Sequence, residues 1–261
     1  MECRRDNFDL DPTVRIATWN VNGIRARHAQ FLEWVEGEKP DVICLQELKA
    51  SLAQVPESIC NLTGYWCYWH GAGAYSGVGL HLRRESFPDE PQFTHPEFDQ
   101  ETRIVQARAG DTVYASVYVP NGGKDYDAKL AFMRSLADYA RSLRESGTRL
   151  VICGDVNVAR TDMDVHPKER KPNIIGQRPE ERELLEGILA QGLVDVARKL
   201  YPNDENYFTW WAPWRNLRQR NIGWRLDYVL ASASLAQRAT SCPSHREIGT
   251  SDHAPVVATF E

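Results

Sequence analysis

The sequence predicts an α/β sandwich, in which helices cover β-sheets from the outside, built as one domain over residues 14–261. Short runs of β-branched and other apolar residues recur along the chain, and helical patterns lie between them. The 261 residues show no shift in composition and no long flexible linker, so one large core is the simplest organisation. With 42% apolar and 26% charged residues, the composition is that of an ordinary globular protein.

Eight runs are expected to form strands, several of them buried on both faces of a sheet. They lie at residues 14–19, 42–45, 78–82, 104–107, 113–119, 150–153, 226–230 and 256–260. Helices are expected at residues 27–37, 125–146 and 179–192. In the second helix, Met133, Leu136 and Ala140 belong to one apolar stripe with a spacing of three or four residues. The third begins at Pro179, a favoured first-turn residue, and stops at Gly192.

Three long connections are rich in Pro, Gly and charge, at residues 86–100, 162–178 and 206–223. Loops of this length in a compact domain are usually functional or disordered. The third connection carries several tryptophans, so we expect it to be ordered.

The first residues of the sequence and its cysteines indicate the cellular compartment of the protein. Residues 1–13 are expected to form an N-terminal tail, and residues 1–12 carry four acidic side chains and no apolar run, unlike a signal peptide or a membrane span. The six cysteines include no CxxC pair, and Cys44 and Cys153 fall inside apolar runs, as reduced core thiols do. These features predict an intracellular protein, in the cytoplasm or nucleoid, with no membrane partner.

The net charge of −5 disfavours a protein that coats nucleic acid without specificity, since such proteins usually carry a basic surplus. It does not exclude a nucleic-acid partner, because clustered carboxylates can coexist with a separate basic rim. One segment provides a local basic concentration in which four arginines alternate with four tryptophans. These residues are Arg215, Arg218, Arg220 and Arg225, with Trp210, Trp211, Trp214 and Trp224.

Polar side chains occur at the ends of five predicted strands. They are Asn20, Glu47, Asp155 with Asn157, Asp227, and Asp252 with His253. Each alone has an ordinary explanation, since an Asx residue at a strand end usually caps a turn and a lone glutamate is usually solvated or ion-paired. Five independent strand ends would all have to carry such residues by accident. We therefore expect them to form one site at the rim of a sheet.

A series of motifs occurs in the order known from one family. The motifs are WNVNGIR (19–25), LQE (45–47), YSGVG (75–79), YVPNG (118–122), GDVN (154–157), GWRLDY (223–228) and SDHAP (251–255). From about residue 14 to 260, the chain resembles the exonuclease III and abasic (AP) endonuclease branch of the endonuclease/exonuclease/phosphatase superfamily. The resemblance implies a DNase I-like fold, which is a four-layer α/β sandwich of two packed mixed β-sheets flanked by helices.

The resemblance also implies a divalent metal site. Glu47 is the expected principal ligand, with Asn20 and Asp252 close to the ion and with Asp155 and Asn157 in the same ligand group. Mg²⁺ is the expected ion, with Mn²⁺ as a substitute, because Mg²⁺ prefers one or two carboxylates and keeps several waters.

Catalytic roles follow from the same resemblance. Asp155 would orient or deprotonate the attacking water, and Asn157 would donate a hydrogen bond to the scissile phosphate. His253 would hold the phosphate as a cation, with Asp227 favouring its charged form. Tyr118 would donate a phenolic hydrogen bond to the phosphate or leaving group. Asp155 is a weak base at its ordinary pKa, so it needs either a raised pKa or a water acidified by metal, and the sequence leaves both open.

Ten residues are expected to contact DNA. By resemblance, Asn22, Arg25, Tyr75, Arg103, Asn121 and Lys124 line the phosphate track or support the metal site, and Trp210, Trp224 and Leu226 line a pocket. A tight apolar pocket would accept an extruded abasic deoxyribose and exclude ordinary nucleotides by their attached base. Core packing is the alternative for the tryptophans. We add the hypothesis that Trp214 is a wedge that stacks into the gap left by the extruded nucleotide.

The chain departs from the family pattern in the loop at residues 166–179. Its Gly176-Gln177-Arg178-Pro179 sequence replaces a more usual glycine-aromatic pairing, and Asn173 is therefore not assigned as a substrate contact.

Together these features predict a monomeric DNA repair phosphodiesterase of base excision repair. The predicted activity is Mg²⁺-dependent hydrolytic incision 5′ to abasic sites in double-stranded DNA, with 3′–5′ exonuclease activity and cleaning of damaged 3′ ends. One alternative is another metal-dependent phosphoesterase of the superfamily, either a non-specific nuclease or an enzyme for a small phosphoester. The other is a catalytically silent DNA-binding protein, because a fold does not imply an activity.

Overall fold

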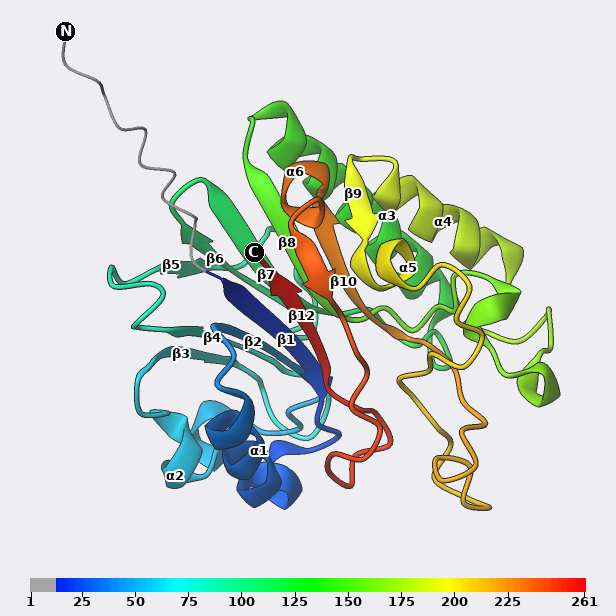
Figure 1. Ribbon diagram of the computed structural model, residues 1–261, viewed down its shortest axis with the longest axis horizontal. Coiled ribbons are helices and arrows are strands. Elements are labelled where there is room, and N and C mark those ends of the chain that lie inside the picture. The colour runs from blue at the N-terminus through cyan, green and yellow to red at the C-terminus, as the bar shows by residue number, and fades with distance from the viewer. Residues whose placement is uncertain (1–12) are drawn as a thin grey trace, which may run out of the picture.

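The computed structural model describes residues 13–261, which form two six-stranded β-sheets (Figure 1). The first sheet has the strand order β11 (Ala239–Ser241), β12 (Val256–Phe260), β1 (Val14–Asn20), β2 (Val42–Gln46), β4 (Val78–Arg83) and β3 (Tyr65–His70). The second has the order β5 (Gln92–Thr94), β6 (Ile104–Ala109), β7 (Thr112–Tyr118), β8 (Arg149–Asp155), β10 (Asp227–Ser232) and β9 (Leu193–Asp195). Of the tail predicted at residues 1–13, only Thr13 is among the described residues.

Both sheets are mixed. The pairs β1–β2 and β7–β8 are parallel, whereas β1–β12, β2–β4, β8–β10 and the remaining pairs are antiparallel. In the first sheet β1 lies between β2 and β12, so the strand nearest the beginning of the described chain pairs with the strand nearest its end.

Helices cover the outer face of each sheet (Figure 1). The helices α1 (Ile24–Glu38) and α2 (Glu57–Cys60) pack on the first sheet, and α3 (Tyr126–Glu145) and α4 (Pro179–Leu189) pack on the second. Two short helices, α5 (Val196–Leu200) and α6 (Ala233–Ala236), lie beside β10, and three 3₁₀ turns occur at Leu52–Gln54, Asp162–Asp164 and Pro167–Glu169. The predicted four-layer α/β sandwich is therefore confirmed.

The main core lies between the two sheets. It contains Ile16 and Cys44 from the first sheet and Val105, Cys153 and Val229 from the second. Because these strands are covered on both faces, their residues are apolar with little alternation, which is why the runs were recognisable in the sequence. Cys44 and Cys153 are buried and free, as expected for reduced core thiols.

All eight predicted strands and the three predicted helices are present, and the differences are local. The predicted connection at 86–100 contains the short strand β5, and helix α1 begins at Ile24 rather than at residue 27. Strand β3, with the sequence Tyr-Trp-Cys-Tyr-Trp-His, was not predicted because it has no β-branched residue, although its aromatic side chains favour strands.

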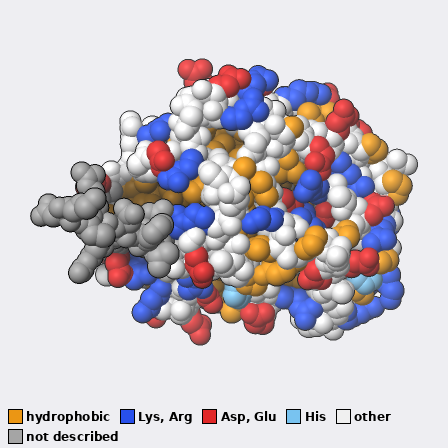
Figure 2. Space-filling model, turned by 45° about the horizontal axis from the view of Figure 1, so that its top comes forward, with side chains coloured by type: hydrophobic (Ala, Val, Ile, Leu, Met, Phe, Trp, Pro, Cys, Tyr) orange, Lys and Arg blue, Asp and Glu red, His pale blue; other side chains and the backbone are white. Residues whose placement is uncertain are grey.

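The surface carries both signs of charge. On the face drawn in Figure 2, acidic and basic side chains are interspersed, in keeping with the small net charge of the chain. Within residues 13–261, every helix is too short or too polar to span a bilayer.

Candidate active site

The two sheets bring the predicted strand-end residues to one edge of the sandwich. Asn20 and Gln46 are partners in the parallel pair of β1 and β2, which places Glu47 directly beyond them. In the second sheet, Asp155 pairs with Tyr118 on one side and with Asp227 on the other. The clustering of polar strand ends, predicted from the sequence, is therefore a property of the strand register.

The centre of this edge is a group of potential metal ligands. Glu47, Asp155 and His253 each offer one ligand atom, and these atoms lie within 4.8 Å of one another. The Asn20 side chain bridges the two carboxylates, donating to Glu47 Oε1 (3.0 Å) and to Asp155 Oδ2 (2.9 Å). Tyr118 donates its hydroxyl hydrogen to Glu47 Oε1 at 2.9 Å. Carboxylate oxygens held in this way suit a hard divalent cation.

A second polar chain extends from Glu47 toward Asp252. Lys49 Nζ lies 2.7 Å from Glu47 Oε2 and donates to Asn22 Oδ1 at 2.6 Å. Asn22 Nδ2 in turn donates to Asp252 Oδ1 at 2.7 Å. Burial raises the pKa of Glu47, but the hydrogen bonds from Asn20 and Lys49 outweigh it, so the net shift is downward and Glu47 stays ionised. Sequence reasoning missed Lys49, and its position two residues after Glu47 was the only available signal.

His253 is held as a buried cation. Its Nδ1 lies 2.8 Å from Asp227 Oδ2, and its Nε2 lies 3.8 Å from Asp155 Oδ2. Burial alone lowers the pKa of His253, but the charges of Asp227 and Asp155 outweigh it and raise the pKa to about 10. Thr209, another residue that sequence reasoning missed, donates to Asp227 Oδ2 at 2.6 Å and fixes the orienting carboxylate.

The surroundings of Asp155 favour its neutral form, whereas those of His253 favour its charged form. Burial raises its pKa, His253 lowers it, and the negative charges of Asp227 and Glu47 raise it again, so the net shift is upward. Asn157 bends back over Asp155 in a left-handed conformation (φ 55°), where its backbone N–H donates to Asp155 Oδ1 at 2.9 Å. A carboxyl group with a raised pKa accepts a proton more readily than an ordinary aspartate does.

A fully buried ion pair supports Asn157 from beneath. Lys129 of α3 pairs with Glu181 of α4, and both side chains have zero exposure. Lys129 Nζ also donates to the carbonyl oxygen of Asn157 at 2.8 Å, while Glu181 Oε2 accepts from the backbone N–H of Gly176 at 2.7 Å. This pair was not predicted, because a lysine and a glutamate on helices are usually solvated.

A recess beside the ligand group is lined by the predicted pocket residues. The recess is lined by the three predicted residues Trp210, Trp224 and Leu226. The lining also includes Asn121, Ile175, Gly176, Glu47, Tyr118, Asn157, Asp252 and His253. The rings of Trp210 and Trp224 meet edge to face at 5.6 Å. Gly176 has φ +91°, and a Cβ there would lie 3.0 Å from Trp224 Cζ3, so the tight wall requires glycine. Trp210 Nε1 donates to Asp252 Oδ2 at 3.0 Å, which connects this wall to the ligand group.

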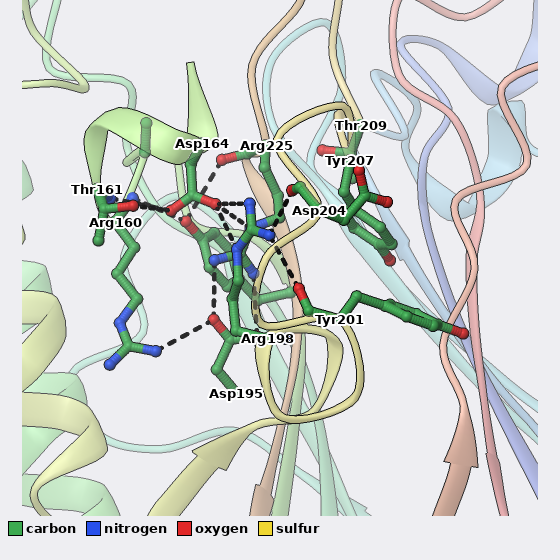
Figure 3. A network of polar contacts seen from close by, with 12 residues as sticks. Arg160, Thr161, Asp164, Asp195, Arg198, Tyr201, Asp204, Tyr207, Thr209 and Arg225 are labelled. Atoms are coloured by element: carbon green, nitrogen blue, oxygen red, sulfur yellow. Dashed lines mark hydrogen bonds and ion pairs between the residues drawn. The ribbon is translucent and has the colours of Figure 1, made fainter. Parts of the chain in front are cut away.

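A network of ion pairs surrounds Arg225, which lies between two pocket residues in the sequence (Figure 3). Arg225, between Trp224 and Leu226, makes a paired contact with Asp195 (3.0 and 2.8 Å) and a contact of 2.7 Å with Asp164. Arg198 also binds Asp164, at 2.6 Å. The inclusion of Arg225 in a basic DNA-binding concentration was therefore wrong, because its side chain is fully buried and neutralised by two carboxylates.

The other arginines and tryptophans of this segment also divide by role. Arg218 donates to the carbonyl oxygens of Arg246 and Ile248, so it attaches the loop to the segment before β12. Trp211 is buried in a small hydrophobic core formed mainly by the loop itself. For this tryptophan, the alternative of core packing is therefore correct. Trp214 is 60% exposed.

The remaining predicted DNA-contact residues, Arg25, Tyr75, Arg103 and Lys124, are not among those that line the recess. Arg103 lies over the Tyr118 ring, with 4.8 Å from its guanidinium carbon to the ring centroid. Tyr75 is 85% exposed, and Arg25 and Lys124 are also exposed. Within residues 13–261, none of these four side chains has a described contact with Glu47, Asp155 or His253.

The fold and the site together define a hydrolytic enzyme of the phosphodiesterase class. Comparison with known proteins narrows this class: the chain belongs to the Endonuclease/Exonuclease/phosphatase family, whose model matches residues 17–253. The chain is 33% identical over 248 residues to an exodeoxyribonuclease of Bacillus subtilis, with 93% of this chain and 98% of that protein covered.

Two further comparisons extend this result. The chain is 32% identical over 257 residues to recombination repair protein 1 of Drosophila melanogaster, and the match covers 97% of this chain but only 38% of that longer protein. The structure of an AP endonuclease from Archaeoglobus fulgidus superposes with a TM-score of 0.85 at 31% identity, covering 95% of this chain and 99% of that chain. The predicted family and fold class are therefore confirmed.

Proposed function

We propose that this chain is a DNA repair phosphodiesterase that hydrolyses the phosphodiester bond 5′ to abasic sites in double-stranded DNA. Exonuclease action from 3′ ends and cleaning of damaged 3′ ends are proposed as further activities of the same site. The observation that carries the proposal is the recess in which a carboxylate–histidine group and a tryptophan-lined pocket share one space. A phosphodiester bound at the carboxylate–histidine group would place its adjoining sugar in the tryptophan-lined pocket.

Mg²⁺ is the proposed cofactor, and the residues present fit it. Glu47 would be the principal ligand, with Asp252 as a second carboxylate, because Glu47 stays ionised. Asn20 would lie beside the ion and orient Glu47 through its amide nitrogen. When bound, the cation would neutralise charge on the phosphate oxygens and lower the pKa of nearby water. Lys49, already paired with Glu47, balances the negative charge of the group.

The proposed chemistry is in-line attack of water on phosphorus. Asp155, with its raised pKa, would accept the proton of that water, and Asn157 would donate to a phosphate oxygen. His253, cationic through Asp227, would stabilise the extra negative charge of the transition state. Burial and the nearby carboxylates raise the pKa of Tyr118 well above its ordinary value, so its hydroxyl remains a donor for the phosphate or leaving oxygen.

The pocket supports the abasic substrate over the alternatives. The apolar wall of Trp210, Trp224 and Leu226, against which Gly176 packs closely, offers an extruded sugar an apolar surface. A small polyanionic phosphoester would instead call for several cations inside the recess, whereas Arg225 in this wall is buried and neutralised. A silent binding protein would not need the ionised Glu47 beside the proton-accepting Asp155.

The test is incision of a duplex carrying one tetrahydrofuran abasic analogue, which cannot undergo β-elimination. We expect cleavage 5′ to the analogue with Mg²⁺, none with EDTA, and a large loss in Glu47→Ala. An undamaged duplex and the exposed-residue variant Asp138→Asn are the controls. Equal cleavage of both duplexes would assign a general nuclease, and cleavage of neither would favour the small-phosphoester or binding-protein alternatives.

A further inference from the structure

A second group of potential metal ligands lies apart from the active site. It consists of His70, the last residue of β3, with His95 and Asp99 on the connection between β5 and β6. Each of the three offers a ligand atom, and these atoms lie within 4.8 Å of one another. His70 Nε2 is 2.5 Å from Asp99 Oδ2, and the two imidazole rings stack at 3.8 Å between centroids.

The surroundings of these side chains are those of a built site. Asp99 Oδ1 accepts from the backbone N–H groups of Arg103 (2.8 Å) and Ile104 (3.1 Å), which leaves Oδ2 directed at His70. His95 Nδ1 lies 3.3 Å from the carbonyl oxygen of Ile104, and its Nε2 lies 2.9 Å from the hydroxyl of Tyr68. Whichever nitrogen of His95 binds an ion, the other therefore keeps the hydrogen-bond partner that metal-bound histidines typically have.

The chemistry of the donors selects the kind of ion. Two imidazoles and one carboxylate suit Zn²⁺ and other first-row transition metals, whereas Mg²⁺ prefers oxygen ligands alone. In a tetrahedral zinc site the ligand atoms lie about 3.3 Å apart, given metal–ligand distances of about 2.0–2.1 Å. The group is thus within small side-chain rotations of that geometry. A contact between His70 and Asp99 alone does not account for His95, whose ring stacks on that of His70.

We propose that His70, His95 and Asp99 bind a first-row transition-metal ion, with water or the Tyr68 hydroxyl as a fourth ligand. This site is independent of the proposed function. The ion would join the end of β3 to the segment that leads into β6. Because Asp99 binds the backbone of Arg103, whose guanidinium lies over Tyr118, the ion would also fix one side of the recess.

The experiment is calorimetric titration of the EDTA-treated, desalted full chain with Zn²⁺, with excess Mg²⁺ present to compete for the active-site carboxylates. We expect one Zn²⁺ per chain in the wild type. Loss of a residue that only supports a metal ligand lowers affinity about 10- to 100-fold. In His70→Gln and in Asp99→Asn, which remove a ligand itself, the affinity for Zn²⁺ should fall by more than that. Glu47→Gln, in the active site, and His28→Asn, on α1, should bind Zn²⁺ as the wild type does.

A second readout keeps the proposal testable if a variant folds poorly. Co²⁺ bound to wild type should give the strong visible absorption of a tetrahedral site, and Zn²⁺ should abolish it by displacement. Absence of stoichiometric Zn²⁺ binding by the wild type would overturn the proposal. Binding that Glu47→Gln loses and His70→Gln keeps would overturn it as well, because it would place the ion in the active site.

Discussion

At His253 two carboxylates determine the protonation state of one side chain. Its pKa is raised to about 10, so the cation is present below that pH and is lost as the pH rises through it. Asp227→Asn removes the nearest negative charge, and we therefore expect the basic limb of kcat/KM to move to lower pH. The pH profile of abasic incision measures this shift. Asp111→Asn, a surface carboxylate change, is the control, and an unmoved basic limb in Asp227→Asn would contradict the role of Asp227.

Trp214 tests the wedge hypothesis at the level of one exposed side chain. Stacking of a base on an aromatic ring contributes about 1–3 kcal/mol, which corresponds to an affinity change of about 5- to 150-fold. We expect Trp214→Ala to weaken binding of abasic duplex within that range and Trp214→Phe to keep most of it. Fluorescence anisotropy with an EDTA-treated sample measures binding without turnover. If Trp214→Ala left both affinity and incision unchanged, the wedge hypothesis would be wrong.

Between α3 and α4, the Lys129–Glu181 pair connects two helices to the Asn157 turn. Lys129→Met leaves Glu181 buried without its partner, and such a loss costs about 3–5 kcal/mol of the free energy of unfolding. The double variant with Glu181→Gln should recover part of this loss, because no charge is then left buried. Urea unfolding of the single and double variants gives the coupling energy. Lys124→Met, an exposed lysine change nearby, should stay within about 0.5 kcal/mol of wild type, and additive losses would contradict the coupling.

Elements with a strong local pattern could be predicted from the sequence. The doubly covered strands β1, β2 and β8 were recognisable as apolar runs, and the stripe on α3 gave its helix. The short strands β5 and β9 were not, since three residues carry no period and their pairing depends on neighbours that are distant in sequence.

The site shows the same division. Motifs placed Glu47, Asp155 and His253 together. The supporting residues Lys49, Thr209 and Lys129 were not predicted, because each is an ordinary residue type whose role arises only from tertiary contact. Arg225 was misplaced for a related reason: a sequence shows that an arginine is present but not that two buried aspartates surround it.

For the whole molecule, a net charge of −5 means that attraction to DNA must come from a few local cations. Each phosphate that a side chain neutralises contributes about −0.9 to the slope of log binding constant against log salt concentration. If Arg25, Arg103 and Lys124 contact phosphates as predicted, replacing any one of them with alanine should reduce the magnitude of that slope by about 1. Anisotropy titrations over a salt series measure it. Arg141→Ala, at the far end of α3, is the matched control and should leave the slope unchanged.

The pairing of β1 with β12 has a consequence for the order in which the protein is made. During synthesis on the ribosome, β1 emerges long before β12, so one side of β1 has no partner until residues 256–260 have also emerged. Asp252 and His253 immediately precede β12, so they reach Glu47 and Asp155 only when this last strand closes the first sheet. If these residues form the nuclease centre as proposed, a nascent chain lacks an assembled centre until this strand has been translated and folded into place.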